Sequence, residues 1–359
     1  MHDEPMHDEP IRDGPLRYGE KKRAQNEKIK IQKEKTLAEQ GAERLRWIGI
    51  VYALAAFIVW GFLPLYWKQL TNVDALEILA HRFIWSFVFV ALLLGWRGGF
   101  PEVRKTLSVP RSRYVLMLAA VLIAINWGVY IWAVNHDHLI DASLGYYMNP
   151  LVSVALGMIV LGERLGKLQK SAILLATLAV LLLALELHKI PWIALTLAFS
   201  FGFYGLAKKM LHIDAATGLF VETMYIVPLA LSYLLYREVR ANWPLLELPW
   251  WQIAMLIGAG IVTALPLLWF AEAANRIPLS TVGIIQYLTP TMKLIFGVLL
   301  FHEPFTWMHG VSFALIWLAL GMYTVELIRG SRKRSLLTVS GTDASDPDPL
   351  AEIGTIRHH

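Results

Sequence analysis

The chain places ionisable side chains inside otherwise apolar stretches, and these residues are the ones best suited to chemistry. His81 and Arg82 lie within ILAHRFIWS, Glu222 within FVET, and Lys293 within PTMKLIFG. A charge in an apolar medium is costly without a partner, so such residues are candidates for binding a ligand, pairing with each other or moving protons. The two cations Arg82 and Lys293 predict a site for an anionic group. Glu222 and His81 predict a place where a proton is taken up or released.

Several other chemistries find no support in the sequence. There is no Cys, which excludes disulfides, thiolate metal ligands and cysteine nucleophiles. The motifs HExxH, GxSxG and GxxxxGK[ST] are also missing, so neither a hydrolase site nor a nucleotide-phosphate loop is expected. The segment HDH at 136–138 fits a solvated loop better than a metal site. We therefore expect no enzyme activity, no metal and no cofactor.

One long motif recurs 140 residues later in the chain. We call this fixed distance of 140 residues the repeat offset, and two residues that it separates are repeat equivalents. GYYMNPLVSVALGMIVLGER covers 145–164 and IQYLTPTMKLIFGVLLFHEP covers 285–304, which pairs Tyr147 with Tyr287 and Pro150 with Pro290. Proline removes a backbone donor and clashes with the carbonyl four residues earlier, so both prolines predict matched kinks that act as hinges or line a cavity. Each tyrosine lies three residues before its proline, near the same helix face, and would present its ring and hydroxyl there. The alternative is that both kinks serve packing alone.

Composition defines the medium in which these residues lie. The 359 residues are 56% hydrophobic and 17% charged, with 14 Trp and a mean hydropathy of +0.48, which indicates an integral membrane protein. The apolar blocks are continuous rather than short and alternating, so an all-α polytopic fold is expected instead of a β-barrel. Runs long enough to cross about 30 Å of hydrocarbon predict ten spans, at 48–67, 76–96, 114–134, 139–161, 170–187, 190–207, 217–236, 250–271, 280–301 and 306–328.

The distribution of Lys and Arg between the loops predicts the orientation. If the chain starts in the cytoplasm, most basic loop residues and both basic tails fall on the cytoplasmic side, in agreement with the positive-inside bias. The first 46 residues contain no apolar core of a signal peptide. We therefore expect a bacterial-type inner membrane with both termini in the cytoplasm. The basic residues flank apolar runs, which favours the lipid bilayer rather than nucleic acid as their partner.

The repeat boundary near residue 188 leaves five predicted spans on each side. Because five is odd, the second copy must be inverted in the bilayer, giving two inverted five-helix repeats. The predicted organisation is a charged cytoplasmic tail at 1–46, repeats at 47–188 and 189–329, and a polar cytoplasmic tail at 330–359. Inverted repeats are typical of secondary transporters, whose halves rock about a shared site for a small molecule. A channel for small solutes is the alternative, and a homo-oligomer is compatible with the sequence.

Several motifs together resemble one known family. They are ILAHRFIWS (78–86), NWGVYIWAVNH (126–136), ASLGYYMNPLVSVALG (142–157), LGER (161–164), FVET (220–223) and QYLTPTMKLIFGVLLFHEPF (286–305). Over about residues 47–329 the chain resembles the EamA-type drug/metabolite transporter superfamily, and above all its RarD group, which is named for chloramphenicol sensitivity. The resemblance implies ten helices in two inverted halves and export or exchange of small metabolites or drugs. It also implies a central cavity lined by the third, fourth, eighth and ninth helices.

Residues in the third and eighth predicted spans have the stacking surfaces and hydrogen-bonding tips that a small organic cargo needs. They are Asn126, Trp127, Tyr130 and Trp269. For the aromatic residues, interfacial anchoring or core packing is the alternative. Glu163 and its repeat equivalent Glu303 lie at span ends, where we expect solvated helix termini rather than part of a cargo site.

Helix rise places the ionisable residues at different depths. At about 1.5 Å per residue, Arg82 lies roughly 9 Å and Lys293 roughly 12 Å below the outer boundary, whereas Glu222 lies about 8 Å from the inner boundary. We therefore expect Arg82 and Lys293 to share an outer cavity that holds an anionic group. Glu222 is expected to serve proton coupling or to bind an amino group, too far from Arg82 to pair with it. In the alternative, the cations only fix helix packing and are neutralised by acids such as Glu77, Glu186 or Asp141.

Overall fold

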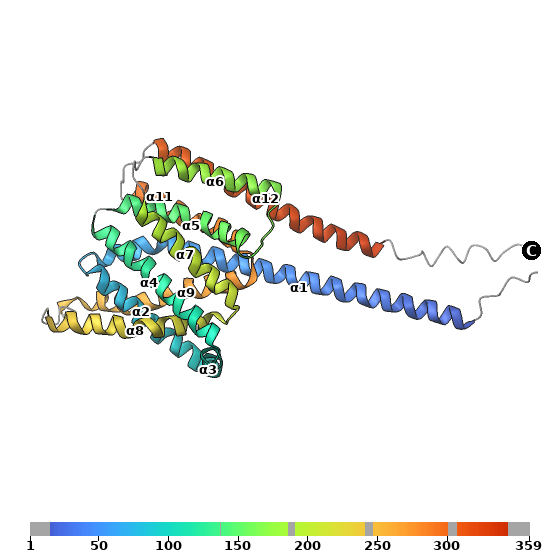
Figure 1. Cartoon of the computed structure of the whole chain (residues 1–359), viewed down its shortest axis with the longest axis horizontal. Coiled ribbons are helices and arrows are strands. Elements are labelled where there is room, and N and C mark those ends of the chain that lie inside the picture. Colours follow the sequence, from blue (N-terminus) through green and yellow to red (C-terminus); the bar gives the residue numbers. More distant parts are fainter. Residues whose placement is uncertain (1–14, 137, 186–190, 241–246, 301–306, 344–359) are drawn as a thin grey trace, which may run out of the picture. The chain divides into compact units, whose positions relative to one another are not determined.

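The computed structural model describes residues 15–136, 138–185, 191–240, 247–300 and 307–343, and every regular element in these ranges is a helix (Figure 1). The elements are α1 (Pro15–Trp67), the 3-10 helix η1 (Lys68–Leu70), α2 (Ala75–Arg97), α3 (Phe100–Ser108), α4 (Pro110–Asn135), α5 (Leu139–Ile159), α6 (Lys167–Leu185), α7 (Trp192–Leu211), α8 (Ala215–Arg240), α9 (Trp250–Arg276), α10 (Leu279–Gln286), α11 (Leu288–Leu300) and α12 (Trp307–Asp343). The expected all-α class is confirmed. Within the described ranges, residues 46–332 form one compact unit, the helix bundle, and residues 15–45 and 333–343 belong to a second unit.

Eight helical segments of the described chain are long and apolar enough to cross a membrane, which confirms a polytopic membrane protein. They are Gln40–Leu70, Ala75–Arg97, Pro110–Ala133, Lys167–Leu185, Ala215–Arg240, Trp250–Arg276, Leu279–Leu300 and Trp307–Arg329. The two other expected spans coincide with α5 and α7. In α5 only the shorter stretch Leu144–Ile159 is apolar, and α7 carries Lys208 and Lys209 in its last turn. Ten spans therefore remain a prediction.

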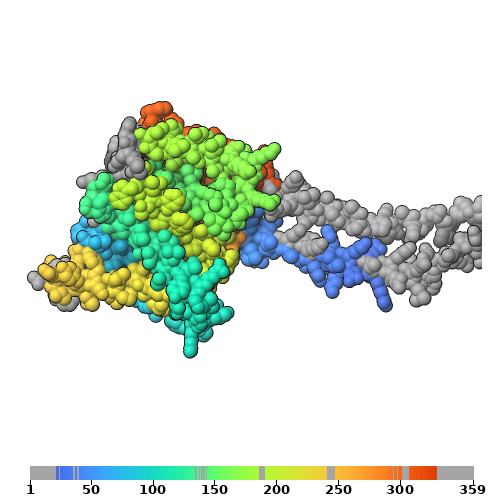
Figure 2. Space-filling model, in the orientation of Figure 1, coloured from blue at the N-terminus to red at the C-terminus, as the bar shows by residue number. Residues whose placement is uncertain are grey.

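Large apolar side chains cover the outside of the bundle, as expected for helices that face lipid. Figure 2 shows one face of the bundle, formed largely by α4, α6, α7 and α8. Exposed residues on these helices include Leu118, Val121, Leu174, Leu178, Phe199, Phe203, Leu229 and Leu235. Lipid provides apolar surroundings for these exposed side chains, so their exposure does not require a partner protein to cover them.

The repeat residues Asp74 and Asp214 perform the same task in the two halves. The Asp74 carboxylate accepts hydrogen bonds from the backbone amides of Leu76 (2.9 Å) and Glu77 (3.4 Å) and caps α2. Asp214, its repeat equivalent, accepts one from the amide of Thr217 (2.9 Å) at the start of α8. An acid at this position satisfies amides that have no partner inside the helix and interacts favourably with the helix dipole.

Two glycines at nearly equivalent places allow close contacts between the halves. A Cβ added to Gly61 in α1 would lie 2.6 Å from the sulfur of Met292 in α11, and one added to Gly202 in α7 would lie 2.6 Å from a methyl of Val152 in α5. Val152 and Met292 are repeat equivalents, and Gly202 lies next to the repeat equivalent of Gly61. The first helix of each half thus approaches the fourth helical region of the other half at matching positions.

The two repeat prolines have different surroundings. Pro150 lies inside the continuous helix α5. Pro290 instead lies in the first turn of α11, just after the chain leaves α10 at Tyr287, where the Tyr287 amide bonds the Ile284 carbonyl at 3.2 Å. Because proline has no amide hydrogen and clashes with the carbonyl four residues earlier, Pro290 explains a break near Gln286. The helix is therefore interrupted beside Pro290 but continuous through Pro150.

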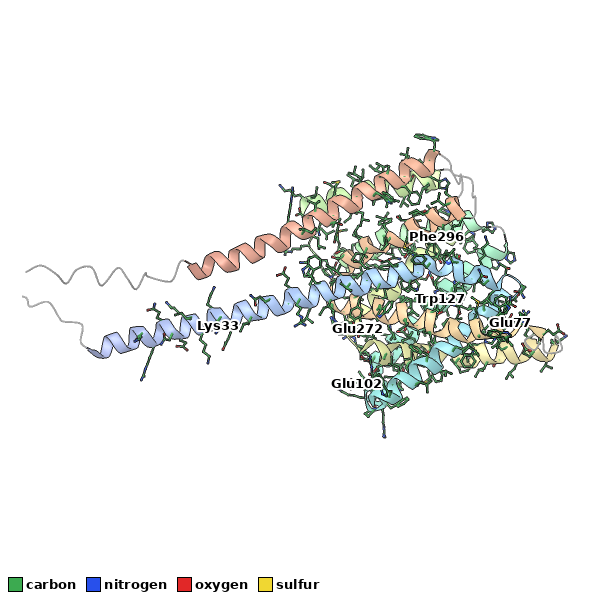
Figure 3. The ribbon with its side chains drawn as sticks, turned by 180° about the vertical axis from the view of Figure 1, so that it is seen from behind. Lys33, Glu77, Glu102, Trp127, Glu272 and Phe296 are labelled. Carbon is green, nitrogen blue, oxygen red and sulfur yellow. The ribbon has the colours of Figure 1, made fainter. Side chains whose placement is uncertain are left out.

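The bundle has two ends, named here after the predicted orientation. The outer end carries Lys68–Leu70 and the start of α2 with Glu77, and the inner end carries α3 with Glu102 and the last turns of α9 with Glu272 (Figure 3). Trp127 lies between these ends, inside the bundle (Figure 3). At the outer end Arg237 of α8 pairs with Glu77 (Nε–Oε2 3.1 Å) and with Asp74 (3.4 Å).

Candidate functional site

A cavity of about 350 Å³ lies inside the bundle and extends to its outer end. Lys68 and Thr71, two of its lining residues, are exposed at that end. The cavity is lined by residues of α1, α2, α4, α5, α7, α10 and α11 and of the segment after α1, namely Phe57, Trp60, Leu63, Pro64, Trp67, Lys68, Thr71, Arg82, Asn126, Trp127, Tyr130, Tyr146, Asn149, Phe201, Gln286, Thr289, Pro290 and Lys293. The cavity therefore combines aromatic walls with a few polar groups, as small-molecule sites do.

Arg82 is held in the cavity wall by aromatic rings. Its guanidinium carbon lies 4.1 Å from the centre of the Trp127 ring and 4.9 Å from that of Trp67. Its Nε donates a hydrogen bond to the hydroxyl of Thr263 (3.0 Å). Cations are attracted to the faces of aromatic rings, so these contacts fix the plane of the guanidinium without neutralising its charge.

Lys293 projects into the same cavity from α11. Its ammonium nitrogen lies 3.7 Å from the centre of the Tyr146 ring and 5.9 Å from that of Tyr130. Among the described residues, neither Lys293 nor Arg82 forms an ion pair. Glu77, one of the acids considered as a partner, pairs with Arg237 instead. Glu186 and the side chain of Asp141 lie outside the described part of the chain.

Asn126, Trp127 and Tyr130 come from α4 and also line the cavity. The amide nitrogen of Asn126 donates to the carbonyl of Leu197 (2.8 Å) and to the hydroxyl of Ser200 (2.9 Å). Asn126 therefore ties α4 to α7 as well as forming part of the wall.

Three of the proposed aromatic residues do not line this cavity. Tyr147 is buried against Phe313, with ring centres 5.3 Å apart. Tyr287 is buried at the junction of α10 and α11. Trp269 packs against buried apolar residues of the bundle core. Pro290 lines the cavity but Pro150 does not. No lining residue among those described comes from α9, the eighth predicted helix.

The tyrosine of α5 that faces the cavity is Tyr146, the residue before Tyr147. Tyr146 and Asn149 face the cavity, and so do Gln286 and Thr289 in the second half. These four residues form two pairs at the repeat offset, Tyr146 with Gln286 and Asn149 with Thr289. Sequence reasoning missed them because it followed identical residues, whereas the repeat conserves position on the helix face while the residue type changes.

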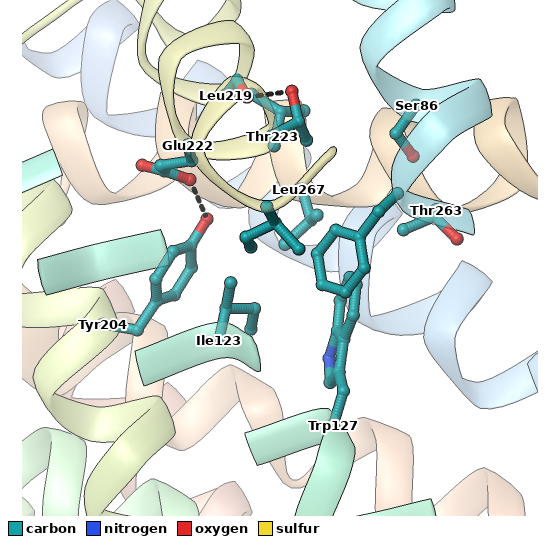
Figure 4. A pocket seen from close by; sticks show the side chains of 11 residues that line it. Ser86, Ile123, Trp127, Tyr204, Leu219, Glu222, Thr223, Thr263 and Leu267 are labelled. Atoms are coloured by element: carbon teal, nitrogen blue, oxygen red, sulfur yellow. Dashed lines mark hydrogen bonds between the residues drawn. The ribbon is translucent and has the colours of Figure 1, made fainter. Parts of the chain in front are cut away.

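Glu222 lies in a different place from Arg82, beside a small enclosed cavity of about 10 Å³ (Figure 4), room for about one water molecule. Its carboxylate pairs with Lys208 (Oε1–Nζ 2.6 Å) and accepts a hydrogen bond from the hydroxyl of Tyr204 (3.2 Å). Trp127 lines both cavities. His81 lines neither, and its Nδ1 accepts a hydrogen bond from the Trp85 indole (3.2 Å).

Glu163 is not a solvated helix terminus, contrary to expectation. Its carboxylate accepts hydrogen bonds from the backbone amides of Leu279 (2.6 Å) and Ser280 (2.9 Å), the first residues of α10. A Cβ at Gly157 would lie 2.6 Å from this carboxylate, so the glycine leaves room for it. The spacing recurs as Gly297 and Glu303, and Glu303 lies outside the described residues. Glu163 thus joins the first half of the chain to the start of a helix in the second.

Comparison with known proteins gives a consistent result. Residues 47–185 and 189–325 each match the EamA-like transporter family. The uncharacterized transporter YojE of Bacillus subtilis is 47% identical, covering 79% of this chain and 96% of YojE. Protein RarD of Escherichia coli is 42% identical, covering 80% of this chain and 97% of RarD, and protein RarD of Streptomyces exfoliatus is 41% identical, with 85% and 99% covered. A crystal structure with 18% identity matches with a TM-score of 0.59 over 78% of this chain and 98% of that one, which shows a shared fold.

The apolar helices, the internal cavity and these relatives define a multi-pass membrane transporter. More specifically, the chain belongs to the EamA-like transporter family and to its RarD group. The family match falls twice on the chain, once in each of the stretches that the sequence assigned to a repeat.

Proposed function

We propose that the protein is a secondary transporter, an exporter or exchanger, that moves small organic metabolites or drugs across the inner membrane by alternating access. The single observation that carries this proposal is a cavity that lies inside the bundle and reaches its outer end. The cavity is the cargo site in its outward-facing form. The sequence has no nucleotide-binding loop, so the driving force is an ion gradient, exchange or the gradient of the cargo itself.

Contacts between α5 and α10 support closure at the inner end. A Cβ at Gly283 of α10 would lie 2.8 Å from the carbonyl oxygen of Pro150 and 3.0 Å from the Cβ of Ser153, both in α5. One turn or more toward the inner end, Glu163 holds the first amides of α10. These contacts hold α5 and α10 together and join the first half of the chain to the second.

The unequal prolines also support two exchanging conformations. In an inverted-repeat transporter, one half adopts in the inward-facing form the conformation that the other half has in the outward-facing form. The continuous helix around Pro150 and the broken helix at Pro290 are two such conformations of one repeat element. In the inward-facing form we expect α5 to bend near Tyr147 and α10 to join α11.

Two single-cysteine proteins test alternating access, and the absence of natural cysteine makes the labelling specific. The outer reporter is Leu63→Cys, in the cavity wall, and the inner reporter is Ser153→Cys, beneath the closed α5–α10 contact. Impermeant maleimides are applied from each side of the membrane. A carrier requires that any change which raises labelling of the inner reporter lowers labelling of the outer reporter. Labels that rise together, or a single-channel conductance, would instead support a channel.

Reporter fusions test the predicted orientation. A fusion after Glu102, at the inner end, is expected to report the cytoplasm. A fusion after Thr306, which lies outside the described residues, is expected to report the exterior. Both fusions on the same side would contradict inverted repeats.

A further inference from the structure

We propose that Arg82 and Lys293 form an anion-recognition site, so that the cargo carries a carboxylate or a similar anionic group attached to a flat apolar body. The inference rests on the proposed function only where it calls the ligand a cargo. The anion site itself depends on the geometry of the outer cavity.

The charge of the cavity wall is one-sided. Its lining residues include Arg82 and Lys293 but no Asp or Glu among the described residues. Arg82 and Lys293 contact aromatic rings rather than carboxylates of the described chain. A ring face attracts a cation but supplies no negative charge, and cations inside a membrane protein normally have a charged partner. A bound anion would supply that partner.

The orientation of Arg82 suits a planar anion. Trp67 and Trp127 fix its guanidinium, and Thr263 accepts from Nε only. In the part of the chain that the structure describes, the terminal guanidinium nitrogens have no hydrogen-bond acceptor. These nitrogens are the ones that bind a carboxylate in bidentate fashion.

The repeat provides an internal comparison. Glu222 is the repeat equivalent of Arg82, and Lys208 lies next to the repeat equivalent of Trp67. In the second half, Glu222 pairs with Lys208 at 2.6 Å. At the corresponding place in the first half, Arg82 faces the ring of Trp67. The charge of Glu222 is therefore balanced by a residue of the chain, whereas the charge of Arg82 is available to pair with a bound anion.

The rest of the cavity indicates the body of the ligand. Phe57, Trp60, Tyr130 and Phe201 offer ring surfaces around the two cations. The volume of about 350 Å³ lies near the lower end of the usual range for small-molecule sites, roughly 300–1,000 Å³. A small aromatic carboxylate fits this description better than a large lipid.

The test uses matched probes of equal shape, indole-3-acetate against indole-3-acetamide and benzoate against benzamide. Affinities are measured by titration calorimetry on the purified full-length protein in a non-ionic detergent. A charge-assisted hydrogen bond predicts that each carboxylate binds about tenfold or more tightly than its amide. Arg82→Gln and Lys293→Gln are each expected to remove this preference. Arg82→Lys should keep part of it, because the charge remains but the bidentate geometry is lost.

Lys170→Gln is the matched control, since it removes the same charge from an exposed position on α6, and it should keep the full preference. If Arg82→Gln does not fold, Lys293→Gln carries the test alone. Equal binding of both members of both pairs to the natural protein would overturn the proposal, and so would a preference that survives both substitutions. Loss of the preference when phosphatidylglycerol is added would assign the site to lipid headgroups and overturn a cargo role.

The outcomes separate this inference from the proposed function. If the two cysteine reporters alternate but carboxylates bind no more tightly than amides, the anion site is wrong and the carrier stands. If the carboxylate preference is present but the reporters open together, the anion site stands and the carrier is wrong.

Discussion

Glu163→Gln is expected to open the inner end of the bundle. The natural carboxylate accepts hydrogen bonds from two backbone amides at the start of α10, at 2.6 and 2.9 Å. Glutamine keeps one oxygen acceptor but places an NH2 group where the second acceptor was, and it loses the negative charge that interacts with the helix N-terminus. The first turn of α10 is then held less firmly against the first half of the chain.

The size of the effect follows from the lost bond. A hydrogen bond to a charged group contributes about 1.5–3 kcal/mol, and about 1.4 kcal/mol changes an equilibrium tenfold. The substitution should therefore shift the equilibrium toward the inward-facing form roughly 10- to 100-fold. If that form starts at about 1% of the population, it rises to about 10–50%.

The assay is the rate of maleimide labelling of the inner and outer reporters, with and without Glu163→Gln. We expect faster labelling of the inner reporter from the inner side and slower labelling of the outer reporter from the outer side. Glu102→Gln is the control, because Glu102 is an exposed acid of α3 that pairs with its neighbour Lys105. Unchanged labelling of both reporters at normal abundance would refute a role for Glu163 in closing the inner end.

Three further substitutions, two of them with a second substitution for comparison, test the remaining contacts. Pro290→Ala restores an amide that can form a hydrogen bond across the break between α10 and α11, so labelling of the inner reporter should increase. An unchanged labelling rate would indicate that Pro290 contributes to packing alone. Glu222→Gln leaves Lys208 buried without a charged partner, which should lower the free energy of unfolding by about 3–5 kcal/mol. Adding Lys208→Gln should recover part of that loss, and strictly additive losses in denaturation experiments would argue against coupling. Gly61→Ala should lower stability by about 1–3 kcal/mol through overpacking, whereas Gly128→Ala, where a Cβ meets open space, should be neutral or stabilising in the same assay.

The sequence predicts the helices well because the membrane imposes a simple requirement on them. Long apolar runs must form helices there, so eight of the predicted spans coincide with eight apolar helical segments. Helix ends are less predictable. The sixth predicted span stopped at residue 207 and left Lys208 in a loop, but α7 continues to Leu211 and buries Lys208 against Glu222. A charged residue can extend a membrane helix when its partner comes from another helix, and hydropathy contains no information about that partner.

The candidate site is predictable only in part, for a related reason. The depth estimate brought Arg82 and Lys293 into one cavity, because rise per residue is a local property of the helix. It could not decide between Tyr146 and Tyr147, which are adjacent on α5 and differ in which neighbours they face. It also could not tell which of the two prolines breaks its helix, because Pro150 and Pro290 have the same local effect on the chain. That difference depends on the conformation of the whole bundle.

The charge difference between the halves suggests why loaded and empty transporter would behave differently. In the proposed carrier, closing the outer end around Arg82 and Lys293 would remove two cations from water without an acid of the described chain to pair with them, and this would oppose closure. An anionic cargo would supply the missing charge, so closure would be easier when the site is occupied. The inner half has no such requirement, because Glu222 and Lys208 balance each other whether or not cargo is present. A transporter in which occupancy favours the change of conformation works most readily by exchange, with each half-cycle carrying a bound molecule.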